Sequence, residues 1–276
     1  MKFISWEEAV QKCLDSPELH NLAHDAYFGD SFEACKRYHA SSEYKEIKQL
    51  IPRQAGKALD LGAGNGILSG ALAMDGWDVT AVEPDSSNLV GAGAIRNLAK
   101  RANININVLE AMGEEIPIKG SKFDLIVARQ VLHHADNLQN FCSEMARLSN
   151  QNTLILTLRD HVINNKKQLL KFFDKHPLHH LYGGENAYTI AEYRAAFISA
   201  GIKIKKEIKS FDSVINYDPM TKDEIYQNIL NISGPLKFIV KILLQVLSFK
   251  FICSFLAFID NRPGRLISFI AQKKVS

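Results

Sequence analysis

Several features that mark particular classes of protein are missing from this sequence of 276 residues. Its four cysteines are scattered, and no two of them form a C-x-x-C pair or stand beside clustered histidines; they are Cys13, Cys35, Cys142 and Cys253. Neither a disulfide framework nor a zinc knuckle is therefore indicated. We expect the cysteines to be reduced thiols in the core.

Neither sign of charge dominates, since 33 Lys and Arg residues face 30 Asp and Glu residues and give a net charge of +3. A nucleic-acid-binding protein needs a concentrated basic surface to displace counterions, so nucleic acid is not an expected partner. The first residues also lack the apolar stretch of a secretory signal. Glu7 and Glu8 stand there instead, and Ser5 with Glu8 predicts the capping box of a helix. We expect a cytoplasmic protein.

What the sequence does have is a globular composition, with 46% hydrophobic and 23% charged residues and no internal repeat. The segment 5–50 is predicted to be helical and to stop before Pro52. Helix-start signals recur at Ser5, Ser16, Asp30 and Ser41. This pattern predicts a helical N-terminal cap, residues 1–52, in front of a larger domain, residues 53–276.

From Lys57 onward, short apolar runs alternate with longer helical patterns. The apolar runs are KALDL, DVTAVE, INVL, FDLIVA and TLILTL. Helical patterns separate them, one around 88–102 and another at 137–149. Strands that alternate with helices build βαβ units and a parallel sheet covered on both faces. The predicted fold class is therefore α/β.

The rest of the chain continues with mixed patterns. It predicts helices at 164–175, 189–200 and within 221–260, a loop at 176–186, and strands at 202–211 and 265–274. Because RLISFIAQKK alternates apolar side chains, we expect 265–274 to be the last strand, antiparallel to 202–211. The connection to such a strand leaves the carboxyl edge of the sheet. We therefore expect residues 212–264 to form a helical lid insertion over the active site.

The strongest motif is LDLGAGNG at 59–66, between a short apolar strand and an amphipathic helix. Glycines at 62, 64 and 66 allow a sharp turn and let a ligand approach bare backbone, and the helix that follows offers unpaired N–H groups. The motif predicts a site for a nucleotide-like ligand. The alternative is a tight turn that binds nothing.

Two acidic residues discriminate between such ligands. Glu83 ends the next strand about 20 residues on, where a carboxylate can bind both hydroxyls of a ribose. A dinucleotide-binding loop would have its third glycine at the position of Ile67, and Asp60 would repel a pyrophosphate. Asp60 suits a ligand that carries an ammonium group, so charge favours S-adenosylmethionine over NAD.

With these residues in place, four motifs stand in a familiar order: DLGAGNG, VEPD at 82–85, AMGEEIP at 111–117 and FDLIVARQVLHH at 123–134. Over about residues 55–160 the chain resembles the class I S-adenosylmethionine-dependent methyltransferases. It is similar to the small-molecule enzymes that resemble the C-methyltransferases of quinone biosynthesis. The resemblance implies a Rossmann-like, seven-stranded sheet in the order 3-2-1-4-5-7-6, with S-adenosyl-L-methionine as cofactor.

The resemblance also implies roles for individual residues. Glu83 would hold the ribose hydroxyls, Met112 and Gly113 would flank the adenine, and Arg129 would lie near the carboxyl end of the cofactor. Many relatives have an acidic residue at the position of Met112, so an apolar contact or Glu114 must substitute. The expected cofactor-binding residues are Asp60, Gly62, Ala63, Gly64, Asn65, Gly66, Glu83, Met112, Gly113, Glu114 and Arg129.

The acceptor site is expected in the segments that follow the strands, because ligands bind outside the carboxyl ends of an open parallel sheet. Methyl transfer from a sulfonium is an in-line displacement, which needs alignment and, for a hydroxyl acceptor, a general base. The candidate bases are His133, His134 and His161, although each ring could merely cap or pack. No Asp, Glu and His spacing typical of a metal site is found, so no metal is expected.

Segment 236–259 is almost entirely apolar, apart from a predicted stripe of Lys237, Lys241, Gln245 and Ser248. The lysines argue against a membrane span, since each central lysine costs about 2.5–3.5 kcal/mol on insertion. The pattern suits a helix on a membrane surface or one that closes an apolar pocket, and a helical pair packed on the domain is the alternative. We therefore expect a small-molecule acceptor, partly apolar or lipid-linked, and peripheral membrane contact.

Two points stay open on the sequence alone. The N-terminal helices, with Tyr27, Phe28, Arg37 and Tyr38, either fold over the cofactor or only cover the sheet. The chain could also be a non-catalytic regulatory protein that binds S-adenosylmethionine or its product, or an NAD-dependent oxidoreductase. The acceptor and the choice among O-, N- and C-methylation are not determined.

Overall fold

A computed structural model describes residues 3–120 and 122–274. Within them, eight strands form one mixed sheet. The strands are β1 (Lys57–Leu61), β2 (Asp78–Val82), β3 (Ile106–Leu109), β4 (Phe123–Arg129), β5 (Ser149–Ile163), β6 (Tyr188–Thr189), β7 (Ile202–Ile208) and β8 (Arg265–Lys273). The fold class is α/β, as predicted.

The strand order is β3-β2-β1-β4-β5-β8-β7, and the two-residue β6 pairs with the end of β5. Strands β1 to β5 pair in parallel, whereas β8 is antiparallel to both of its neighbours. Without β6 in the numbering, this is the predicted order 3-2-1-4-5-7-6. The prediction that 265–274 pairs antiparallel with the 202–211 segment is thus confirmed.

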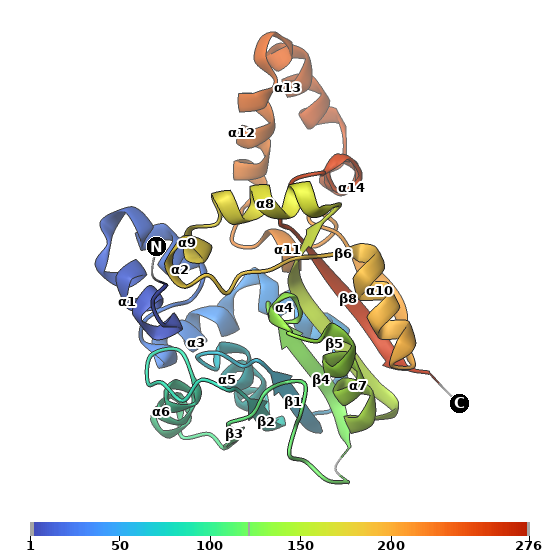
Figure 1. The fold of residues 1–276 in the computed structure, drawn as a ribbon. Helices are drawn as coiled ribbons and strands as arrows, with labels where there is room; N and C mark the ends of the chain where they lie inside the picture. Colours follow the sequence, from blue (N-terminus) through green and yellow to red (C-terminus); the bar gives the residue numbers. More distant parts are fainter. Residues whose placement is uncertain (1–2, 121, 275–276) are drawn as a thin grey trace.

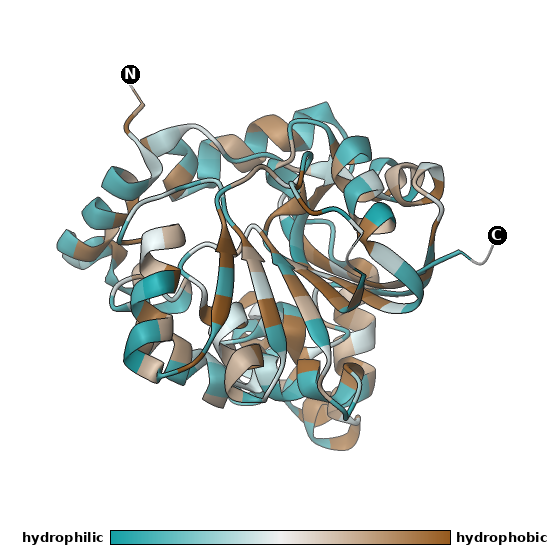
Figure 2. Ribbon diagram, turned by 90° about the horizontal axis from the view of Figure 1, so that it is seen from below, coloured by the Kyte–Doolittle hydropathy of each residue, from teal (hydrophilic) through white to brown (hydrophobic). Residues whose placement is uncertain are grey.

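Helices cover both faces of the sheet (Figure 2). They are α1 (Trp6–Asp15), α2 (His20–Asp25), α3 (Ser31–Ala40), α4 (Ser42–Leu50), α5 (Ile67–Met74), α6 (Ala92–Ala102), α7 (Leu138–Leu148), α8 (Lys166–Lys175), α9 (Pro177–Tyr182), α10 (Ile190–Ser199), α11 (Val214–Tyr217), α12 (Lys222–Ile232), α13 (Lys237–Val246) and α14 (Phe249–Ile259). Alternate residues of β4 face different cores: Leu125 and Val127 pack with α3 to α5, Ile126 and Ala128 with α7 and α10.

The N-terminal helices begin where the sequence predicted. Ser5 and Glu8 form a capping box on α1, and the side chains of Asp30 and Ser41 cap α3 and α4. Tyr38 and Tyr44 are fully buried against the sheet. Helices α3 and α4 are therefore integrated into the core on one face of the sheet, whereas Cys13 of α1 and Ala23 of α2 pack in a separate cluster with Leu178 of α9.

Two local predictions were wrong. The predicted loop at 176–186 contains helix α9, which Pro177 starts and Gly183 ends in a left-handed conformation. Ser248 does not belong to the polar stripe of a continuous helix, because it caps α14 after α13 has ended at Val246. The apolar segment is thus two short helices with a break between them.

Helices α12 and α13 project from the body at the top of Figure 1, and α14 lies at the base of this projection; we call the three helices the arm. Most of the large apolar side chains of the arm are exposed, in contrast to those of the sheet helices. Among the described residues, no helix is both long and apolar enough to cross a membrane.

Candidate functional site

The site begins at the turn between β1 and α5. Gly62, Gly64 and Gly66 have φ angles of 61°, 56° and 83°, a region that other residues rarely adopt. A Cβ atom on Gly62 would lie 2.1 Å from Cγ2 of Val131, so the loop after β4 packs directly on bare backbone. A Cβ on Gly64 would meet no atom closer than 4.0 Å, which leaves this glycine open to a ligand.

The two acidic residues flank this turn. Asp60 is 1% exposed and accepts a hydrogen bond of 2.6 Å from the Ser69 hydroxyl. Burial raises the pKa of Asp60 to about 7. Because the carboxylate is buried, a ligand cation would bind it with little competition from solvent. Glu83 accepts the N–H of Gly64 at 2.7 Å and that of Asp85 at 3.0 Å, and burial raises its pKa. These bonds hold the Glu83 carboxylate against the glycine turn.

A cavity of about 310 Å³ opens at the turn. It is lined by Trp6, Ala26, Phe28, Asp60, Gly62, Ala63, Gly64, Asn65, Ile67, Leu68, Glu83, Pro84, Val90, Arg129, Gln130, Val131, His134 and Tyr182. The side-chain amide of Asn65 donates to the carbonyl of Tyr27 at 2.7 Å and so ties the N-terminal segment to the turn. We call this space the donor cavity.

Three residues expected to bind the cofactor are placed outside the lining of this cavity, and their role stays a prediction. Met112, Gly113 and Glu114 do not line the donor cavity. The Met112 side chain is 49% exposed, Gly113 packs against Phe141, and Glu114 accepts the backbone N–H of Asp136. Gly66 likewise turns away from the cavity and packs on Ile95.

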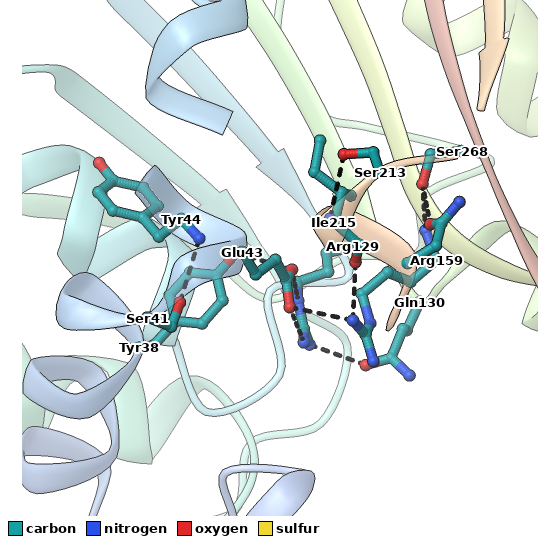
Figure 3. A network of polar contacts seen from close by, with 11 residues as sticks. Tyr38, Ser41, Glu43, Tyr44, Arg129, Gln130, Arg159, Ser213, Ile215 and Ser268 are labelled. Carbon is teal, nitrogen blue, oxygen red and sulfur yellow. Dashed lines mark hydrogen bonds and ion pairs between the residues drawn. The ribbon is translucent and has the colours of Figure 1, made fainter. Parts of the chain in front are cut away.

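Arg129, at the end of β4, lines the donor cavity but is not free (Figure 3). Its guanidinium forms a bidentate ion pair with the fully buried Glu43 of α4, at 2.7 and 2.9 Å. The same carboxylate lies 3.4 Å from Arg159 of β5, whose Nη1 donates to the carbonyl of Ile215. Burial favours the neutral form of Glu43, but both arginines hold its pKa below the usual value. Glu43 thus connects α4 with β4 and β5 and, through Arg159, with α11.

The three candidate bases have different surroundings. His134 lines the donor cavity, and its Nδ1 lies 3.0 Å from the carbonyl oxygen of Gly184. His133 is 1% exposed, and its Nδ1 lies 3.0 Å from the buried carboxylate of Asp160. Burial lowers the pKa of His133 and raises that of Asp160 to about 8. Only His134 of the three borders the donor cavity among the described residues.

His161 lies instead at a second cavity of about 360 Å³, with Arg159, Asp218 and the α14–β8 connection. The start of the 212–264 insertion borders this second cavity, and none of the described residues in 212–264 lines the donor cavity. The expectation that residues 212–264 cover the active site, where the acceptor binds, stays a prediction. The donor cavity is closed by Trp6, Phe28 and Tyr182.

Sequence reasoning missed Glu43, Asp160 and Glu185, three buried carboxylates around the site. Glu43 stands in a helix that looked like an ordinary surface helix. Asp160 directly precedes a histidine at the end of a strand, and that position could have been recognised as facing the crevice. Glu185 gave no signal, because the histidines His133 and His161 near it lie in other segments.

The fold and this site define the class of protein. Residues 59–157 match the family model described as a methyltransferase domain. The solved S-adenosylmethionine-dependent methyltransferase from Clostridium acetobutylicum has the same fold, with a TM-score of 0.53 and 9% identity over 87% of this chain and 92% of that one. Residues 59–157 therefore match a methyltransferase domain, and the whole chain has the fold of the class I methyltransferases.

Curated relatives narrow the likeness further. The chain is 28% identical over 111 residues to the ubiquinone biosynthesis O-methyltransferase of Azorhizobium caulinodans, and 33% identical over 102 residues to that of Rickettsia canadensis. These matches cover 40% and 37% of this chain, and 43% and 39% of the relatives. The chain thus matches about two-fifths of each relative's length, in the part that contains the glycine turn.

Proposed function

We propose that this protein transfers a methyl group from S-adenosylmethionine to a small, partly apolar acceptor, and that it works at a membrane surface. The observation that carries the proposal is the donor cavity, where a buried carboxylate stands on each side of an open glycine turn. Asp60 would bind the ammonium group of the cofactor and Glu83 the ribose hydroxyls. The name of the curated relatives, ubiquinone biosynthesis O-methyltransferase, supports the choice of reaction.

The chemistry needs alignment first. Transfer from a sulfonium is an in-line displacement that discharges the cation, so a site that fixes both partners lowers the barrier. His134 is our choice for the general base toward a hydroxyl acceptor. If its Nδ1 proton is donated to the Gly184 carbonyl, Nε2 has a free lone pair at the donor cavity. His133, which is buried against Asp160, would support the ring of His134, whose centroid lies 4.1 Å away.

The N-terminal helices would close over the bound cofactor. Trp6 and Phe28 line the donor cavity, and the Trp6 ring packs on Phe28 and on Tyr182 of α9. A cover of this kind excludes water while the sulfonium reacts. In this proposal, residues 1–52 act as a lid as well as a structural cap.

The proposal for the acceptor depends on the helices of the arm. Its exposed large apolar residues are Ile232, Leu236, Phe238, Ile239, Ile242, Leu243, Val246, Leu247, Phe251, Phe255, Phe258 and Ile259. Exposed Lys237, Lys241 and Lys250 lie among them. Apolar side chains with interspersed lysines are typical of helices that lie in the interface of an anionic membrane. A lipid-like acceptor would reach the enzyme from the same membrane.

Isothermal titration with S-adenosylmethionine and S-adenosylhomocysteine tests the donor half. Binding of both in the micromolar range is expected, and no binding at high micromolar concentration would refute the cofactor assignment. NAD is the control ligand, because the oxidoreductase alternative requires it to bind instead.

Co-sedimentation with vesicles tests the membrane half. The protein should pellet with vesicles that contain anionic phospholipid, and less with zwitterionic ones. Methyl transfer to a panel of prenylated phenols and to their unprenylated analogues then separates an enzyme from a regulatory binder. An enzyme that ignores vesicles and methylates only polar acceptors would contradict the proposal.

A further inference from the structure

A second group of titratable side chains lies beside the donor cavity and is not needed for methyl transfer. His161 of β5, His176 between α8 and α9, and Glu185 after α9 bring one nitrogen or oxygen atom each to within 4.8 Å of one another. The three residues come from three segments, which is why no ligand spacing is visible in the sequence. Spacing along the chain predicted no metal site, but the fold brings three possible ligands together.

The protonation of this group leaves lone pairs that face each other. The Nδ1 of His161 lies 2.8 Å from the carbonyl oxygen of Gly264, which can only accept, so Nδ1 carries the proton and Nε2 does not. The Nε2 lone pair of His161 is therefore free to bind a ligand. Neutral imidazoles are the form that binds metal ions.

The carboxylate at the centre has no short contact with these rings. Glu185 is 6% exposed, and its Oε1 lies 3.9 Å from Nδ1 of His176, beyond hydrogen-bonding range. That Nδ1 atom is buried and has no hydrogen-bond partner. The Tyr182 hydroxyl donates to Glu185 at 2.9 Å and holds the carboxylate in place. A buried ring nitrogen without a partner, next to a buried carboxylate, is costly unless something binds there.

We propose that His161, His176 and Glu185 bind one divalent transition-metal ion, with Zn²⁺ as the expected occupant. Two imidazoles and one carboxylate with a free position suit Zn²⁺ rather than Mg²⁺, which prefers oxygen ligands. The Nδ1 bond of His161 to a backbone carbonyl is the outer contact typical of a metal-binding histidine. The second cavity, which His161 lines, provides an entry path.

The group also lies beside the candidate base. The His133 ring centroid is 4.7 Å from that of His161 and 4.1 Å from that of His134. If the protein transfers methyl groups as proposed, an ion at this place would lower the pKa of an acceptor hydroxyl near His134. The binding of the ion itself does not depend on that function.

The test uses the full-length protein, stripped with a chelator and titrated with Co²⁺ and Zn²⁺. We expect one equivalent of Co²⁺ with the visible absorption of a four- or five-coordinate ion, displaced by Zn²⁺ but not by Mg²⁺. Zn²⁺ should also raise the Tm of the wild-type protein, because it binds only the folded state. No visible band and no rise in Tm would overturn the proposal, even if S-adenosylmethionine binds normally.

Variants locate the ion. Glu185→Gln and His161→Ala should each weaken Co²⁺ binding at least 10-fold, whereas exposed His24→Ala should leave it unchanged. His134→Ala should also retain the ion, because His134 is outside the proposed ligand set. Equal Co²⁺ affinity in all four variants, or loss only in His134→Ala, would overturn the assignment. If Glu185→Gln fails to fold, the wild-type Tm measurement and His161→Ala still decide.

Discussion

Helix α5 and the arm helices α13 and α14 are all strongly apolar, yet they have opposite surroundings. Residues Ile67 to Leu72 of α5 are buried, and the turn before them forms the donor cavity. In the arm, Phe238 and Phe258 are 74% and 79% exposed. An apolar helix is stable in water only if something covers it. The sheet covers α5, whereas in the proposed function a membrane surface covers the arm.

Because the donor cavity and the arm have different surroundings, a substitution in one should leave the binding property of the other unchanged. The exception is a residue that connects the two regions. Glu43 is that residue, since it pairs with Arg129 at the donor cavity and with Arg159, which bonds to α11 at the root of the arm. The largest effect is therefore expected from a substitution of Glu43.

Glu43→Gln should lower the free energy of unfolding by about 3–5 kcal/mol, because it leaves two buried arginines without their counter-charge. Urea denaturation measures this loss, and both cofactor and vesicle binding should weaken together. Glu33→Gln, in which an exposed ion pair with Lys36 is removed, is the control and should cost about 1 kcal/mol or less. A loss below about 1 kcal/mol in Glu43→Gln would mean that the ion pair does not support either region.

Asp60→Asn should weaken S-adenosylmethionine binding by about 1.5–3 kcal/mol, or roughly 10- to 150-fold, because the ammonium group loses its ionised partner. The asparagine can still accept from Ser69, so folding should be retained. Calorimetric titration gives the affinity, and vesicle binding should not change. Asp78→Asn, at the exposed start of β2, is the matched control. An unchanged affinity in Asp60→Asn would remove Asp60 from the cofactor site.

The double variant Phe255→Ser and Phe258→Ser should reduce vesicle binding at least about 10-fold, because each buried aromatic side chain contributes on the order of 1.5–3 kcal/mol. Its affinity for S-adenosylmethionine should equal that of the wild type, which is the converse of Asp60→Asn. Ile198→Ser removes an equally exposed apolar residue, 72% exposed, from α10 outside the arm and should have no effect. Equal vesicle binding in all three proteins would show that the arm does not contact the membrane.

The smallest expected effect is a pH dependence that belongs to the donor cavity alone. Burial raises the pKa of Asp60 to about 7 in the free protein, and a bound ammonium group favours the ionised form. Below pH 7 the protein must therefore release a proton to bind, and affinity should fall by up to about tenfold per pH unit. Titrations from pH 5.5 to 7 measure the slope, since an α-amino group stays protonated there. The slope should be smaller in Asp60→Asn and the same in the arm variant.

The sequence by itself determined the sheet and the donor half of the site. Hydrophobic runs with intervening helical periods are local features, so they predicted the α/β class and the antiparallel last strand. Asp60, the glycine turn and Glu83 also follow from local spacing, because a βα turn and the next strand end lie together in any parallel sheet. For the same reason Arg129 and His134 could be assigned to the carboxyl edge.

Only the tertiary structure decided what surrounds these residues. The pairing of Glu43 with Arg129 joins residues 86 positions apart, and the meeting of His161, His176 and Glu185 joins a strand with two later loops. Such contacts depend on how helices dock on the sheet, and no short-range pattern encodes docking. Packing also places Trp6, Ala26 and Phe28 of the N-terminal segment at the donor cavity, which the described residues of 212–264 do not line, because the docking of helices and loops decides which segments border a cavity.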